Sequence, residues 1–122
     1  MSDLVRIIEY RDDIDSKCIK FEFTRGIKKI VELKLFNIEI TENGEKEAVE
    51  LPEKNKRYGV VVYSAGKHEF VFESGRTLFN DGAKIEIIVI EISKSEEEQY
   101  SFVFKDNNWV TKEDVENGQT NK

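Results

Sequence analysis

The balance between branched and unbranched aliphatic residues is the feature that most constrains this chain. It contains 13 isoleucines and 11 valines, but only 5 leucines and 3 alanines. Side chains branched at Cβ suit a pleated strand and lose rotamer freedom in a helix. No segment shows a sustained helical period, and 122 residues are enough for one ordinary domain. We therefore expect an all-β protein, a single-domain antiparallel β-sandwich or flattened barrel of about 8–9 strands.

Short segments that alternate apolar and polar residues support this class, because a strand with one buried face has a period of two residues. The apolar positions of three such segments are Ile19, Phe21 and Phe23; His68, Phe70 and Phe72; and Tyr100, Phe102 and Phe104. We expect an opening strand over residues 4–10. The continuous valine run at 60–62 predicts part of a central strand.

Two longer apolar segments change phase. In the first, Val31, Leu33 and Leu35 are followed by Phe36, Ile38 and Ile40, and in the second, Ile85 and Ile87 are followed by Ile88, Ile90 and Ile92. A shift of one residue moves every later side chain to the other face of the sheet. We therefore expect a bulge or sharp bend near Leu35 and Phe36, and bent long strands that form the corners of the sandwich.

Turn signals separate these segments and bound the domain. Asn43-Gly44 and Asp81-Gly82 predict hairpins, because both residue types tolerate a positive φ, and Asp106-Asn107-Asn108 is a weaker signal of the same kind. We expect one domain over residues 1–110. The polar tail at 111–122 is expected to form at most one helical turn and then to be disordered.

Charge and membrane signals narrow the function. The chain has 19 Lys and Arg residues against 25 Asp and Glu residues, a net charge of −6. General nucleic-acid binding is therefore not expected, since no broad positive surface can face a phosphate backbone. No apolar run is long enough to span a membrane, and no signal peptide is seen, so a cytoplasmic location is expected.

The residues that carry catalytic chemistry are sparse. A single cysteine (Cys18) excludes an internal disulfide, and a single histidine (His68) excludes two-histidine mechanisms. Cys18 is expected to be a small buried residue. Asp12, Asp13 and Asp15 lack the glycine and the distant glutamate of a calcium loop, so a solvated turn is expected. Phosphate-binding, dinucleotide-binding and nucleophile-elbow motifs are absent. We expect no enzyme, no metal and no cofactor.

One candidate ligand site is a turn followed by a tryptophan, formed by Asp106, Asn107, Asn108 and Trp109. An exposed indole beside amide side chains can hold a sugar, because the ring stacks on the apolar face while amides bind hydroxyls. The alternative, which we favour, is a hairpin turn that leads into a core tryptophan.

The second candidate is a set of basic residues in two connections: Arg25, Lys28 and Lys29, and Lys54, Lys56 and Arg57. In an antiparallel sandwich, successive connections lie at alternating ends. Residues 24–29 and 53–57 would then share one end and give it a charge of +5. We expect these residues to bind a partner.

These observations leave several function classes open. The leading hypothesis is a non-catalytic interaction module that docks on a protein partner, as inhibitor, immunity and assembly proteins do. The alternatives are a lectin-like sandwich that binds carbohydrate or a small ligand, and a structural, virion-type protein that forms homo-oligomers through its strand edges. Fold analogy cannot choose among them.

Overall fold

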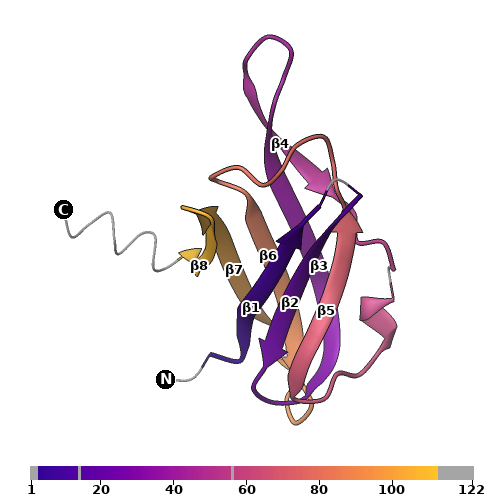
Figure 1. Ribbon diagram of the computed structural model, residues 1–122. Helices are drawn as coiled ribbons and strands as arrows, with labels where there is room; N and C mark the ends of the chain where they lie inside the picture. Colours follow the sequence, from indigo (N-terminus) through magenta and orange to yellow (C-terminus); the bar gives the residue numbers. More distant parts are fainter. Residues whose placement is uncertain (1–2, 14, 56, 113–122) are drawn as a thin grey trace, which may run out of the picture.

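The computed structural model describes residues 3–13, 15–55 and 57–112. Its eight strands form two antiparallel sheets that pack as a β-sandwich (Figure 1). The three-stranded sheet has the order β1-β2-β5, with β1 Val5–Asp12, β2 Ser16–Phe23 and β5 Gly66–Glu73. The five-stranded sheet has the order β4-β3-β6-β7-β8, with β3 Ile27–Ile40, β4 Lys46–Leu51, β6 Lys84–Glu91, β7 Glu98–Lys105 and β8 Asn108–Thr111. The all-β sandwich expected from the sequence is confirmed.

The core lies between the two sheets and follows the alternation seen in the sequence. Ile19, Phe21 and Phe23 of β2 are all buried and point toward the five-stranded sheet. Phe21 meets Phe102 of β7 there, with ring centroids 6.3 Å apart. Since each predicted alternating segment forms a strand with its aromatic face inward, the period of two residues was a correct guide to the core.

The expected bulge at Leu35 and Phe36 is wrong. Both residues pair with β4 in regular register, opposite Leu51 and Glu50. The register shifts of β3 against β6 lie nearer its start, between Ile27 and Lys29 and between Ile30 and Glu32. β6 itself alternates regularly along its whole length, with Ile85 and Ile87 inside and Ile88 on the outer face, so its expected bend is also wrong.

The apparent phase change has a different cause. Beyond Leu35, the inner positions of β3 are occupied by polar residues, Asn37 (0% exposed) and Glu39 (6% exposed). Phe36 and Ile38 lie on the outer face, in phase with Glu32 and Lys34 before them. Beyond Leu35 the backbone of β3 stays regular. The apolar residues fall on the outer face there because the inner positions are occupied by polar side chains that form buried hydrogen bonds.

Those hydrogen bonds fix the connection between β5 and β6, which crosses from one sheet to the other. The Asn37 side-chain amide donates to the backbone oxygen of Leu78, and the Glu39 carboxylate accepts from the backbone amide of Arg76. The Asp12 carboxylate accepts from the backbone amide of Phe79. Asp12 is the last residue of β1 and is mostly buried, so the expectation of a solvated turn is wrong for this residue.

The predicted turns form hairpins only where they connect two strands of the same sheet. Asn43-Gly44 connects the paired strands β3 and β4, with Gly44 at φ 82°, and the predicted hairpin is confirmed. Asp106 and Asn107, at φ 53° and 63°, form the tight hairpin between β7 and β8. Gly82 also has a positive φ, 97°, but β5 and β6 belong to different sheets, so the hairpin predicted there is wrong.

The strand predicted for the valine run is also wrong. Residues 60–62 lie in the connection between β4 and β5, residues 52–65, which we call the connector. The run begins in a short 3₁₀ helix, η1 (Tyr58–Val60), and continues as irregular chain. It contributes no buried residue to the core. β-Branched residues in a continuous run resemble a buried strand in composition, but here they face solvent.

The ends of the described chain bear on the expected domain boundary. β8 ends at Thr111, the first residue of the expected polar tail, and residues 113–122 of that tail lie outside the described residues. Within the described ranges, no helix is both long and apolar enough to cross a membrane.

Candidate functional site

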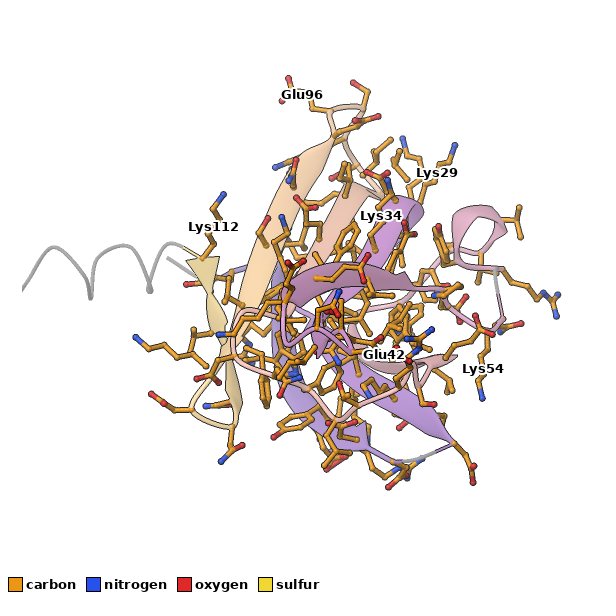
Figure 2. All side chains as sticks on the ribbon, turned by 90° about the horizontal axis from the view of Figure 1, so that it is seen from above. Lys29, Lys34, Glu42, Lys54, Glu96 and Lys112 are labelled. Atoms are coloured by element: carbon orange, nitrogen blue, oxygen red, sulfur yellow. The ribbon has the colours of Figure 1, made fainter. Side chains whose placement is uncertain are left out.

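The structure does not bring the predicted basic residues together. Arg25 and Lys28 lie at the end of the sandwich where β2 leads into β3. Lys54 lies at the opposite end, where its ammonium donates to the backbone oxygen of Asp15 over 3.1 Å. Figure 2, seen from above, shows Lys29 and Lys54 well apart. Lys56 lies outside the described residues. The expected single basic pole is therefore wrong.

The alternation of connections failed because β4 is short. It pairs only with the second half of β3, from Leu35 to Ile40, and so ends in the middle of the sandwich. The connector then bonds to β5 near Phe72, close to the turn between β1 and β2, before it crosses to the other end. The connector therefore runs along one side of the molecule, beside β5 (Figure 1).

Acidic residues also reduce the charge at the end that holds Arg25. The Arg25 guanidinium lies 2.8 Å from the carboxylate of Glu91, a residue that is buried at the end of β6. The Lys94 ammonium lies 3.0 Å from the other oxygen of the same carboxylate. The hydrogen bonds from Arg25 and Lys94 lower the pKa of Glu91 to about 2. The buried Glu91 thus offsets part of the positive charge at this end of the sandwich.

Trp109 belongs to the core, as favoured above. It is 7% exposed and packs edge-on against Phe79, with ring centroids 5.1 Å apart, and against Phe104 at 5.2 Å. The backbone oxygen of Asn107 accepts a hydrogen bond from Tyr10, and the Asn108 side chain accepts one from the Trp109 backbone amide. Asp106 is an exposed turn residue. A buried indole cannot stack on a sugar, so we do not propose the lectin-like site.

The connector is fixed to both sheets by its backbone. At its start, the backbone oxygen of Pro52 accepts from the amide of Glu73, and the amide of Lys54 donates to the oxygen of Val71, both in β5. At its end, Tyr63 and Ile27 of β3 exchange two backbone hydrogen bonds of 2.8 and 2.9 Å. These hydrogen bonds tie both ends of the connector to the sandwich.

Between these anchors the connector presents apolar side chains to solvent. Val60 is 84% exposed, Val61 38% and Val62 63%. The tyrosines on either side, Tyr58 and Tyr63, pack against the hydrophobic core instead. The tyrosines thus hold the segment while the valines point outward. Isolated exposed valines need no explanation, but a continuous run on a fixed segment is typical of an interaction site.

A pocket lies beside this run, between the connector and β5. Its lining comprises Glu53, Asn55, Arg57, Tyr58, Val61, Tyr63, His68, Glu69 and Phe70. Tyr63 makes ring contacts with His68 at 5.1 Å and Phe70 at 5.7 Å. Burial and, second, the charge of Glu53 raise the pKa of Tyr63, so its hydroxyl stays protonated at neutral pH. The pocket lining thus combines aromatic rings with charged side chains, of which Glu53 is buried.

The remaining candidate groups have structural roles. Cys18 is buried, as expected, and its Sγ accepts a hydrogen bond from the Arg11 guanidinium. His68 Nε2 lies 2.9 Å from the backbone oxygen of Ser64. In the described parts of the chain, no group of three or more His, Cys, Asp or Glu residues could hold a metal ion.

Sequence reasoning included the basic residues of the connector but missed its valines. A signal was present. The segment Tyr58-Gly59-Val60-Val61-Val62-Tyr63 is bounded by tyrosines and follows a polar stretch with the only proline, yet it shows no period-two alternation. A continuous apolar run without alternation fits either a buried strand or an exposed contact surface.

Comparison with known proteins adds a distant structural likeness. No family model and no curated protein matches the chain. Among solved structures, a similar chain belongs to the archaellum periplasmic stator protein complex FlaF and FlaG from Sulfolobus acidocaldarius. It is 10% identical, the match covers 85% of this chain and 90% of that chain, and the TM-score is 0.44. We base no part of the function on so distant a likeness.

Proposed function

We propose that this protein is a non-catalytic interaction module that docks on a protein partner through its connector surface, which we define as Arg57, Tyr58, Val60, Val61 and Val62. The observation that carries the proposal is the exposed valine run held between two anchored tyrosines. Leaving these side chains in water is unfavourable, and a partner that covers them gains about 25 cal/mol for each Å² of apolar surface buried.

The geometry of the connector favours docking over mere exposure. The Tyr63 anchor on β3 and the Lys54 anchor on β5 fix the segment at both ends. A fixed segment loses little conformational entropy on binding, and pre-organisation of this kind increases affinity. The valines are thus a ready-made contact surface.

Charge gives the partner a second property. Lys54 and Arg57 precede the valine run in the connector, and neither forms an ion pair with the described residues. Cationic side chains at the rim of an interface accelerate association with an acidic partner. The net charge of −6 at the same time disfavours indiscriminate binding to long polyanions.

Paired charge substitutions test the proposal. The double variant Val60→Asp/Val62→Asp removes the apolar run, and Ile40→Asp/Leu78→Asp is a matched control at similarly exposed apolar sites (58% and 59%). Each protein is used to capture partners from an extract of the cells that produce it, with quantitative mass spectrometry. We expect a partner that the wild type and the control recover and that the valine variant loses.

Equal recovery by all three proteins would overturn the docking role of the connector. Sedimentation of the purified proteins addresses self-association in the same experiment. One outcome is that the wild type and the control both sediment as dimers while the valine variant sediments as a monomer. In that case the partner is a second copy of this chain, and the proposal of a different partner protein is wrong.

A further inference from the structure

The four edge strands of the two sheets are not protected equally. β1 is interrupted by a register shift between Ile7 and Glu9, β4 has 6 residues and β8 has 4. Bulges and shortness are common ways to prevent an edge from pairing with another chain. β5 has neither feature. It pairs with β2 at eight consecutive positions with no register shift, so its outer edge is long and regular.

The connector covers only half of this edge. It bonds to the Val71 oxygen and the Glu73 amide. In an antiparallel strand, the backbone groups of alternate residues point to the same edge. The amide and carbonyl of Lys67 and Glu69 therefore point to this side as well. No described residue makes a backbone hydrogen bond with them there. One half of the edge is sealed and the other presents unpaired donors and acceptors.

The aromatic pocket lies beside the open half. His68, Glu69 and Phe70 of β5 form one wall, and Tyr58, Val61 and Tyr63 of the connector lie opposite. A strand bound along an edge directs alternate side chains to the same face, two residues apart. A peptide paired with Glu69 would therefore place one apolar side chain in this pocket.

The charges near the open edge are mainly positive. Arg57 and Lys67 lie beside it, and neither forms an ion pair with the described residues, whereas Lys54 belongs to the half that the connector covers. Glu69 is the exposed carboxylate of the pocket lining, whereas Glu53 is buried. A local excess of cations in a chain of net charge −6 favours an acidic ligand.

We propose that the partner binds by adding an extended acidic segment to β5 as a new strand, paired with the backbone of Lys67 and Glu69. One apolar side chain of the segment fills the aromatic pocket, and its neighbours contact the exposed valines. Main-chain hydrogen bonds supply affinity in this mode, and pockets for alternate side chains supply specificity. The inference rests on the proposed function and names the chemistry of the partner.

The probe is a displayed library of short random peptides, selected on the wild-type protein. We expect the selected peptides to share acidic residues and one apolar anchor, with apolar and polar positions alternating. A synthetic selected peptide is then N-methylated at one backbone nitrogen at a time. Methyl groups on nitrogens that face β5 should weaken binding about tenfold, and those on the intervening nitrogens should have little effect, because only alternate amides face the strand.

A pair of protein variants tests the same contact from the other side. Glu69→Pro removes the backbone amide that points to the open edge, at a position where an edge strand tolerates proline. Glu69→Ala removes the side chain but keeps the amide. We expect Glu69→Pro to weaken peptide binding about tenfold or more. Glu69→Ala keeps the amide and removes a carboxylate that repels an acidic ligand, so it should bind at least as tightly as the wild type. If Glu69→Pro does not fold, the N-methylation series on the wild type still decides.

Other outcomes would overturn strand addition. These are a selection that enriches no acidic alternating sequence, N-methylation losses without a period of two, or full binding by folded Glu69→Pro. A partner protein whose capture depends on Val60 and Val62 but not on the amide of Glu69 would leave the docking function intact and contradict only this mode of binding.

Discussion

The ammonium of Lys17 lies 2.8 Å from the carboxylate of Asp12 inside the sandwich, where the lysine side chain is 1% exposed. The same ammonium donates to the backbone oxygens of Ser74 and Thr77, both at 2.7 Å. This ion pair therefore fixes the connection between β5 and β6 to the three-stranded sheet. Removal of the lysine ammonium would leave a buried carboxylate and two backbone oxygens without their partner.

Lys17→Met is expected to lower the free energy of unfolding by about 3–5 kcal/mol, because Asp12 and two carbonyl groups lose their partner. Urea denaturation measures the loss. Lys20→Met, which breaks the more exposed ion pair between Lys20 and Glu9, is the control and should cost about 0–1 kcal/mol. Equal losses in the two variants would contradict the structural role assigned to Lys17.

Leu35 and Phe36 are neighbours in sequence but occupy opposite faces of β3. Leu35 is 0% exposed, so Leu35→Ala should cost about 2–5 kcal/mol. Phe36 is half-buried on the outer face beneath the ammonium of Lys84, so Phe36→Ala should cost clearly less. Comparison of the two denaturation midpoints tests the regular register of β3, since a bulge that buried both side chains would make the costs similar.

Glu91 makes stability depend on pH in the acid range. Arg25 and Lys94 hold its pKa at about 2, below the ordinary value of 4.5, so folding favours the ionised form. This contribution is present above the ordinary pKa and is lost as pH falls through the folded value. Denaturation at a series of acid pH values should show Glu91→Gln to be less stable than the wild type at neutral pH. The difference should narrow toward pH 2, whereas a constant difference would contradict the lowered pKa.

The fluorescence emission of Trp109 should be blue-shifted and should not change when soluble glycans are added, because its ring lies in the core. Its buried Nε1 has no hydrogen-bond partner among the described residues. Trp109→Phe should therefore cost much less than Trp109→Ala, which leaves a large cavity and should cost about 3–5 kcal/mol. A saturable change in emission on addition of a glycan would contradict the core assignment.

The sequence was sufficient to predict the sandwich because its strands obey a local rule. Phe21, Phe70 and Phe102 each sit in an alternating segment, and alternation records which side of a strand is buried. Asn43-Gly44 likewise fixes a hairpin through the backbone of two adjacent residues. Features decided within a few residues of one another were predictable.

Features that depend on contacts between residues far apart in the sequence could not be predicted. Asn37 and Glu39 face inward because the connection between β5 and β6 lies against them, about 40 residues along the chain. The path of the connector depends on where β4 stops pairing with β3. This path in turn determines the position of Lys54. Hydrophobic patterns do not record either contact.

The way in which the connector is held also affects how this surface can change over evolutionary time. Its anchors at Lys54 and Tyr63 are main-chain hydrogen bonds, which do not depend on side-chain identity. Val60 and Val62 between them are largely exposed, so most substitutions there have little effect on stability. Mutations at these two positions can therefore alter recognition while the sandwich is preserved. A lineage that carries this scaffold can acquire new binding specificities without first gaining stability to compensate.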